Sequence, residues 1–121
     1  MKYLDQGDMF ILREDGRVLC EAVVLPSGDG ECELMNLAVA EDIQRRGIGS
    51  EMVTLLMKRY AREHHSMLVG TSQSGVGFYQ RLGFEPVFVR KDFFVNNYER
   101  PVVENGTVLR DMYCLRALLR P

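Results

Sequence analysis

The sequence predicts a mixed α/β fold in which a mostly antiparallel central sheet is flanked by helices. Three β-rich segments joined by short turns open the chain, and this arrangement is typical of an antiparallel meander. Helical periodicity then begins near the middle of the chain and a buried strand follows it, so a parallel, right-handed strand–helix–strand crossover is expected there. The predicted order is therefore β-β-β-α-β-α-β-β.

The first half of the chain supplies the meander and the longer helix. Residues 9–13 and 18–25 flank an Asp15-Gly16 turn, and residues 31–39 follow a second turn-forming segment. From Gly49 to about residue 63, apolar side chains recur at steps of three and four, which predicts an amphipathic helix. The apolar face of this helix, which we expect in the core, comprises Met52, Val53, Leu56, Met57 and Tyr60.

The second half is predicted to alternate short strands and helices. The expected elements are a strand at 67–71, a helix at 74–82, a strand at 84–90, a helical turn at 92–98 and one long final strand at 107–118. Ser74 and Asp92 are the expected N-caps, and Gly83 is the expected left-handed stop of the first helix. An Asn105-Gly106 turn leads into the final strand.

The composition fits one globular domain that spans residues 1–121. Of the residues, 46% are hydrophobic and 26% are charged. Fifteen Lys and Arg against seventeen Asp and Glu give a formal net charge of −2, so the charge pattern of a nucleic-acid binder or a polybasic membrane adaptor is missing. No apolar run approaches the roughly 18 residues of a membrane span, so neither export nor membrane insertion is expected.

The cysteines favour a reducing, cytoplasmic environment. Cys20, Cys32 and Cys114 are odd in number and show no CxxC spacing, which argues against a disulfide framework and against a zinc site. Each lies in a β-rich segment, so we expect three small packed hydrophobic side chains and no metal.

A strand, a glycine-bearing turn and a helix start follow one another between residues 34 and 50. Backbone N–H groups that point outward at such a helix start form an anion site. Gly47 and Gly49 allow the backbone to approach a phosphate, while Arg45 and Arg46 add positive charge. A helix start that binds no ligand would show the same pattern. A dinucleotide or ATP loop is not indicated, because Met52 stands where GxGxxG needs a glycine and the chain has no Gly-Lys pair.

Residues 44–49 read Gln-Arg-Arg-Gly-Ile-Gly, and residues 77–86 read Gly-Phe-Tyr-Gln-Arg-Leu-Gly-Phe-Glu-Pro. The first segment resembles the Q/R-x-x-G-x-G/A loop with which the GCN5-related N-acetyltransferases, the GNAT superfamily, hold the pyrophosphate of acetyl-CoA. The second is similar to the FYxxxGF stretch of the same family. The resemblance extends over about residues 9–118 and is greatest to small bacterial members whose tail stands here as Asp92-Phe93-Phe94, Tyr98, Glu104-Asn105-Gly106 and Asp111-Met112.

The resemblance implies that acetyl-CoA binds along one strand and the turn after it. The backbone of Leu37, Ala38 and Val39 would meet the pantetheine arm as an added strand would. The backbone N–H groups of the turn would hold the pyrophosphate, and they belong to Gln44, Arg45, Arg46, Gly47, Ile48, Gly49 and Ser50.

The resemblance also places residues around the FYxxxGF-like stretch in the cosubstrate site. Ser72 stands where the family commonly has an Asn that bonds the pantetheine, seven residues before Tyr79, so that contact would be made by a shorter group. Gly75 meets the family's need for a small residue four positions before the tyrosine. Phe78 and Tyr79 complete this part of the site.

Two residues are candidates for catalysis. Tyr79 would give its phenolic proton to the departing thiolate, although a core aromatic would occupy the same position. Glu33, near the start of the pantetheine-pairing strand, is the candidate general base, and a solvated charge at a strand end is the alternative. His64 and His65 follow the long helix and suit cations that face its C-terminal dipole rather than catalytic groups.

The predicted function is acetyl transfer from acetyl-CoA to a primary amine of a small molecule or protein, by direct attack in a ternary complex. The alternatives are a non-catalytic acetyl-CoA-binding sensor or interaction module and a purely structural subunit. Only residues 1–8 precede the first hairpin, so the family's N-terminal strand and helices are expected to be largely missing. We therefore expect a homodimer that covers the exposed apolar edge, paired through the final strand 107–118.

Overall fold

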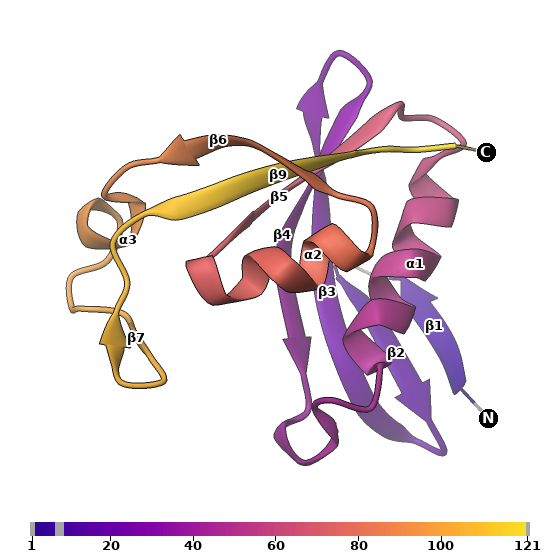
Figure 1. Cartoon of the computed structure of the whole chain (residues 1–121). Coiled ribbons are helices and arrows are strands. Elements are labelled where there is room, and N and C mark those ends of the chain that lie inside the picture. The colour runs from indigo at the N-terminus through magenta and orange to yellow at the C-terminus, as the bar shows by residue number, and fades with distance from the viewer. Residues whose placement is uncertain (1, 7–8, 121) are drawn as a thin grey trace. The chain divides into compact units, whose positions relative to one another are not determined.

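A computed structural model describes residues 9–120 and, by its backbone, the segment 2–6 (Figure 1). The chain divides into two compact units, one formed by Met1–Met67 with Leu118–Pro121 and the other by Leu68–Ala117. Strand β5 (Ser66–Thr71) runs from the first unit into the second. The described pairings within each unit are antiparallel, and helices accompany the strands in both, which confirms the predicted fold class.

The first unit contains four strands whose order in the sheet is their order in the sequence. They are β1 (Lys2–Gln6), β2 (Phe10–Glu14), β3 (Arg17–Gly28) and β4 (Glu31–Val39), each antiparallel to the next. Asp15 and Gly16 have φ of 50° and 81°, and Asp29 and Gly30 have φ of 42° and 76°. Positive φ at both loop residues matches the right-handed twist of the flanking strands, so these turns set the register of the meander.

Strand β1 corrects the expectation that the N-terminal strand is missing. Its residues pair with β2 from Lys2 opposite Glu14 to Gln6 opposite Phe10. The segment is too polar to be recognised as a strand from its sequence. An edge strand of an antiparallel sheet can be polar, because the hydrogen bonds of its backbone to one neighbour hold it in place.

Helix α1 (Ile48–Tyr60) follows the short 3-10 helix η1 (Glu41–Ile43) and packs against β3 and β4. Met52, Val53 and Leu56 are fully buried, while Met57 and Tyr60 at the side of the apolar face are half-buried. The helical periodicity therefore predicted the part of the first unit's core that α1 contributes. At 13 residues α1 is the longest helix in the described part of the chain, and none there combines the length and apolar character that a membrane crossing needs.

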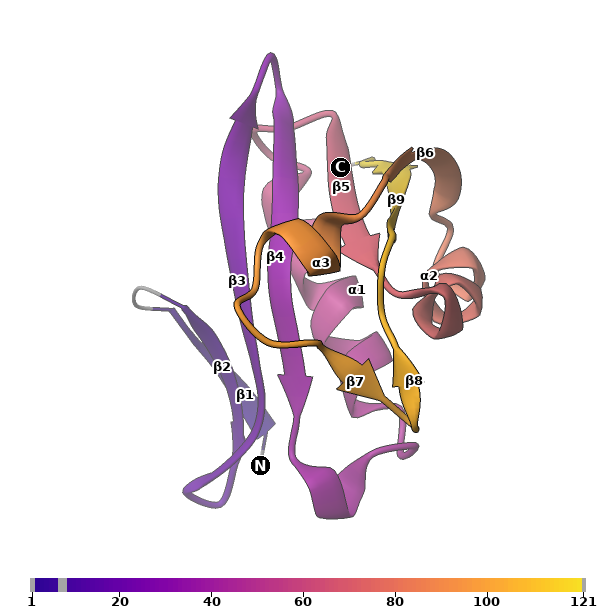
Figure 2. The ribbon, with the colours of Figure 1, turned by 90° about the vertical axis from the view of Figure 1, so that its left-hand side faces the viewer.

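The second unit has the strand order β5-β9-β6, in which β9 (Met112–Leu118) is antiparallel to β6 (Glu85–Arg90). Helix α2 (Val76–Arg81) follows the 3-10 helix η2 (Gln73–Gly75) and contacts β6. Between β6 and β9 the chain forms α3 (Phe93–Asn96) and a small hairpin of β7 (Val103–Glu104) and β8 (Thr107–Val108) (Figure 2).

The long final strand was predicted wrongly. Residues 107–108 pair with β7 instead, and the chain resumes strand structure only at Met112. β9 lies between β5 and β6 and is therefore not an edge through which a second copy could pair. Strand β6 stands at the end of the described strand order of this unit.

Of the two predicted N-caps, Ser74 is wrong, whereas Asp92 does stand at the N-cap position of α3, without a side-chain capping hydrogen bond. Gly75 stands at the N-cap of α2, and the Ser74 hydroxyl instead donates to the Glu104 carboxylate. Asp92, before α3, is left-handed with φ of 55°, and its carboxylate accepts a hydrogen bond from Arg110 at 2.8 Å. Both side chains found partners distant in sequence, which local capping rules do not consider. The stop at Gly83 is confirmed by its φ of +98°.

Candidate functional site

The turn between β4 and α1 is held in shape by its backbone and by one side chain. Arg45 and Gly47 both have positive φ, 74° and 78°, and the Gln44 side-chain amide donates to the Val39 carbonyl at 3.3 Å. Ile43 is buried beneath the turn, whereas Arg45 and Arg46 are exposed. The turn therefore presents its backbone and two cations to solvent.

Helix α1 begins directly after this turn. The Glu51 N–H donates to the Gly47 carbonyl at 3.0 Å, which is the first bond of the helical ladder. The N–H groups of Ile48, Gly49 and Ser50 precede that bond and have no carbonyl within the helix to reach. They lie at the positive end of a 13-residue helix, which is the geometry that attracts an anion.

The ion pair between Arg17 and Asp42 connects the turn to the start of β3. The hydrogen bond from the Arg17 guanidinium lowers the pKa of the Asp42 carboxyl below its ordinary value. Asp42 belongs to η1, so the pair restrains the segment that leads into the turn.

Strand β4 carries the residues predicted to meet the pantetheine arm. Leu37, Ala38 and Val39 lie opposite Ala22, Glu21 and Cys20 of β3, respectively. The register shifts by one residue at Met35, since Val23 faces Asn36 while Val24 faces Leu34. Such a bulge bends the strand and increases its twist. Glu33 is half-buried on the same strand, two residues before the bulge.

Tyr79 is buried in the second unit with an exposed fraction of 7%. Its ring makes edge contacts with Phe78 at 4.9 Å and Phe84 at 5.5 Å between centroids. Its carbonyl accepts the N–H groups of Leu82 and Phe84 at the end of α2. The ring is thus firmly oriented by packing, and its catalytic role stays a prediction.

Ser72 directly precedes the 3-10 helix η2, and Gly75 is the last residue of that helix. Ser72 is buried, with 7% of the residue exposed. Its hydroxyl lies 3.0 Å from the Ser74 hydroxyl and donates to the Glu104 carboxylate at 2.9 Å. A Cβ at Gly75 would overlap the Thr71 hydroxyl. Packing within the chain is therefore one reason for a glycine here, and the Ser72 hydroxyl already has polar neighbours.

A family model described as "Acetyltransferase (GNAT) domain" matches residues 5–86. The chain belongs to the GNAT acetyltransferase family. The match includes the whole segment from β4 through the turn to Tyr79, and it ends before α3, the β7–β8 hairpin and β9.

Three similar proteins illustrate the family. The N-acetyltransferase YvbK of Bacillus subtilis (strain 168), itself described as uncharacterized, is 27% identical over 115 residues, which cover 92% of this chain and 74% of that protein. An IAA acetyltransferase from Bacillus cereus ATCC 14579 is 31% identical with a TM-score of 0.87, over 92% of this chain and 77% of the other. A GNAT family acetyltransferase from Elizabethkingia anophelis, solved with acetyl-CoA bound, is 30% identical with a TM-score of 0.86. The similarity covers 92% of this chain and 75% of that protein.

The GNAT residues predicted from the sequence fall into both units. The β4 and turn residues, from Leu37 to Ser50, belong to the first unit, and Ser72, Gly75, Phe78 and Tyr79 belong to the second. Within the described residues, no group of three or more His, Cys, Asp and Glu side chains is arranged to hold a metal ion.

The histidines and cysteines make packing and backbone contacts within the fold. The His64 ring lies 5.4 Å from the Tyr60 ring, and the His65 N–H donates to the Gly30 carbonyl at 2.7 Å. Cys20, Cys32 and Cys114 are buried free thiols, as expected. Burial raises the pKa of Cys20 and of Cys32 to about 11, so both are neutral near pH 7.

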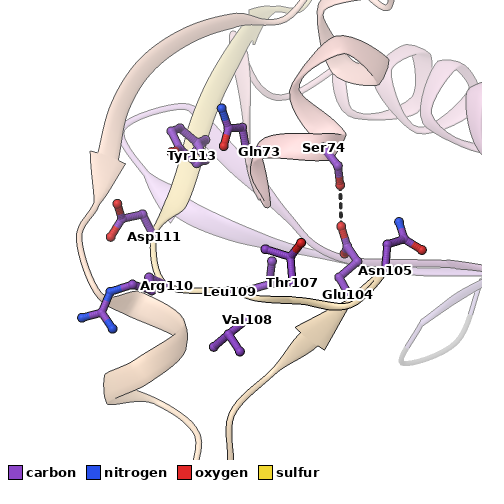
Figure 3. Close-up of a pocket in the computed structure, with 10 residues that line it drawn as sticks. All are labelled: Gln73, Ser74, Glu104, Asn105, Thr107, Val108, Leu109, Arg110, Asp111 and Tyr113. Atoms are coloured by element: carbon purple, nitrogen blue, oxygen red, sulfur yellow. Dashed lines mark hydrogen bonds between the residues drawn. The ribbon is translucent and has the colours of Figure 1, made fainter.

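One feature of the second unit escaped the sequence analysis. A cavity of about 450 Å³ is lined by residues of η2, the β7–β8 hairpin and the start of β9 (Figure 3). Its lining consists of Gln73, Ser74, Glu104, Asn105, Thr107, Val108, Leu109, Arg110, Asp111 and Tyr113. The Glu-Asn-Gly and Asp-Met segments of the tail were the available signal, since both contribute to this lining.

Proposed function

We propose that this protein transfers an acetyl group from acetyl-CoA to a primary amine of a small molecule or protein, by direct attack in a ternary complex. The observation that carries the proposal is the turn into α1, where Gly47 at φ +78° precedes three N–H groups at the start of a helix. The family membership and the acetyl-CoA bound to a relative that is 30% identical support the same cosubstrate.

In this proposal each part of the predicted site has one task. The backbone of β4 from Leu37 to Val39 pairs with the pantetheine arm, and the N–H groups from Gln44 to Ser50 hold the pyrophosphate. Arg45 and Arg46 are exposed and can reach further phosphates. Ser72, Gly75 and Phe78 complete the thioester end of the site, and no metal takes part.

The reaction then needs three proton movements. Glu33 accepts a proton from the ammonium form of the acceptor, directly or through water, and the neutral nitrogen attacks the thioester carbonyl carbon. As the C–N bond forms and the C–S bond breaks, the Tyr79 hydroxyl protonates the departing thiolate, and the second proton that the nitrogen loses as the amide forms restores the Tyr79 hydroxyl. The products are an N-acetylated amine and CoA. A covalent intermediate on Cys20 or Cys32 is disfavoured, because the raised pKa of each keeps its thiol protonated.

A binding module without turnover is the second candidate. Two observations favour it: the Tyr79 ring is packed between Phe78 and Phe84, and the Ser72 hydroxyl already donates to Glu104. Release of CoA from acetyl-CoA in the presence of a panel of amines separates the two candidates. Turnover with any amine supports the enzyme. Binding of acetyl-CoA without CoA release across the panel would establish the sensor instead.

We also propose that the protein is a cytoplasmic homodimer, with β6 in place of the final strand as the pairing edge. Val87, Phe88 and Val89 are 43–46% exposed although they are consecutive apolar residues of one strand. Such a strand at the end of the described strand order of its unit is a template for an identical strand across a twofold axis.

A further inference from the structure

The cavity of the second unit has the size of a small-molecule site. Its volume of about 450 Å³ lies within the range of roughly 300–1,000 Å³ that is usual for ligand pockets. Gln73 and Ser74, on one side, belong to η2, the 3-10 helix that precedes the helix carrying Tyr79. The β7–β8 hairpin and Tyr113 line it as well (Figure 3).

One carboxylate in this cavity has a fixed orientation. The Oε1 atom of Glu104 accepts hydrogen bonds from both the Ser72 and the Ser74 hydroxyls, and Figure 3 shows Glu104 and Ser74 directed toward each other. Asn105 and Gly106, with φ of 51° and 79°, form the tight turn that holds Glu104 opposite Thr107. The side chain is therefore oriented before any ligand binds, which reduces the entropic cost of binding.

Of the other charged groups of the lining, Arg110 has an ion-pair partner, and Asp111 has a neutral backbone donor. The Arg110 guanidinium pairs with Asp92 at 2.8 Å, and the Asp111 carboxylate accepts the Asp92 N–H at 2.8 Å. Among the described residues, the hydrogen-bond donors to Glu104 are two neutral hydroxyls. Glu104 and Asp111 thus both carry negative charge that attracts a cationic ligand, and Glu104 is the one whose Oε1 atom is held by two side-chain hydroxyls.

A cation held at Glu104 is a poor candidate for the reacting nitrogen. An ion pair stabilises the charged form of an amine and raises its pKa, whereas attack on a thioester needs the neutral form. The carboxylate therefore fits an anchor for a second cationic group of the acceptor. Val108, Leu109 and Tyr113 offer apolar lining for the chain that joins the two nitrogens.

We propose that this cavity binds a small-molecule diamine, one ammonium of which is held by Glu104 while the other amino group is acetylated. The inference rests on the proposed acetyl transfer. The anchored ammonium keeps its proton throughout. The other nitrogen loses a proton, forms the amide bond to the acetyl carbon, and the C–S bond of acetyl-CoA breaks to give CoA. Ser72 and Ser74 are positioning residues for Glu104.

The test compares 1,4-diaminobutane with butylamine, which has the same carbon chain and one amino group. CoA release gives kcat/KM for each amine, with wild type, Glu104→Gln and the control Glu85→Gln, whose side chain is exposed on β6 and does not line the cavity. Wild type and the control should prefer the diamine about fivefold or more, and Glu104→Gln should prefer it less than about twofold, with KM for acetyl-CoA unchanged. Raising the salt concentration should reduce the wild-type preference, because it screens an exposed ion pair.

The outcomes distinguish this inference from the proposed function. Turnover with no diamine preference, or a preference that survives both Glu104→Gln and high salt, overturns the diamine site and leaves acetyl transfer intact. If no amine is turned over, the proposed acetyl transfer is refuted. Calorimetric titration of 1,4-diaminobutane into the protein with CoA then tests diamine binding to the cavity independently of turnover. Weaker diamine binding in Glu104→Gln would support the site. Equal binding in both proteins, or none in wild type, would overturn it.

Discussion

Replacement of Gly49 by alanine should stabilise the fold and weaken acetyl-CoA binding at the same time. Gly49 is the second residue of α1 and, unlike Gly47, is not among the glycines with positive φ, so alanine fits its backbone. Alanine is favoured over glycine in a helix by about 0.5–1 kcal/mol. For a chain of 121 residues this corresponds to a rise in melting temperature of about 2–4 °C.

The same methyl group should interfere with the pyrophosphate. Cβ atoms of a helix tilt toward its N-terminus, so the methyl group that Gly49→Ala adds would stand among the N–H groups of residues 48–50. These are the groups that have no carbonyl within the helix to reach. If the phosphate can no longer approach them closely, the dissociation constant of acetyl-CoA should rise about tenfold or more, which is about 1.4 kcal/mol. Calorimetric titration measures this loss, and thermal unfolding without ligand measures the gain in stability.

Thr54→Ala is the matched control. Thr54 is exposed on α1, and alanine there also raises helix propensity, by about half a kcal/mol, while the first turn stays unchanged. This variant should bind acetyl-CoA as wild type does. Gly47→Ala should differ from both, because its φ of +78° strains any L residue and costs about 1 kcal/mol or more. A Gly49→Ala protein that is more stable and still binds acetyl-CoA with wild-type affinity would refute the assignment of the turn.

Three further predictions concern the two units. Tyr79→Phe keeps the ring that packs against its neighbours and removes the phenolic proton. Turnover should therefore fall about 100-fold, with unchanged affinity for acetyl-CoA. A loss of turnover under about threefold would show that Tyr79 serves in packing. The thiols of Cys20 and Cys32 keep their protons up to about pH 11 in the folded protein, against an ordinary pKa of 9.0, so stability should decline between about pH 9 and 11. Urea unfolding across that interval measures the decline, which replacement of both cysteines by alanine should reduce; the part that remains includes Tyr60, whose pKa burial also raises. Phe88→Glu places like charges across the proposed β6 pairing, so sedimentation should show monomers of this variant and dimers of wild type; monomeric wild type would refute the dimer.

The parts of the fold that could be predicted are those specified by local chemistry. The two-residue turns at Asp15-Gly16 and Asp29-Gly30 need positive φ, and Asp-Gly is a residue pair that favours such turns. The apolar residues of α1 recur with the period of a helix, which identifies the face of the helix that is buried. Three of these residues are fully buried in the structure. β1 lacks both signals, because an edge strand is specified by its neighbour more than by its own residues.

The second unit shows where local signals mislead. Ser74 and Asp92 have the residue types of N-caps and precede helical segments, yet their side chains bond to Glu104 and Arg110. A hydroxyl or carboxylate bonds whichever partner the tertiary fold brings near, and these partners are 30 and 18 residues away. The break between β8 and β9 has a similar origin, since residues 107–108 pair with β7 rather than extending β9. A run of β-forming residues does not reveal which strand each part of it will join.

Ser72 marks the limit of what the family pattern conveys about the candidate site. The family pattern has a pantetheine-binding Asn at this position. The shorter serine implies that the hydrogen bond to pantetheine is weaker or is made by another group. In the structure the Ser72 hydroxyl is buried and donates to Glu104, which belongs to the part of the chain beyond the family match. Since Ser74 donates to the same oxygen, two residues before α2 orient one carboxylate of the tail. A departure from the family pattern at Ser72 is thus accompanied by a contact with the tail, at Glu104. That coupling is the physical reason for seeking the acceptor's specificity in the tail rather than in the motifs that hold acetyl-CoA.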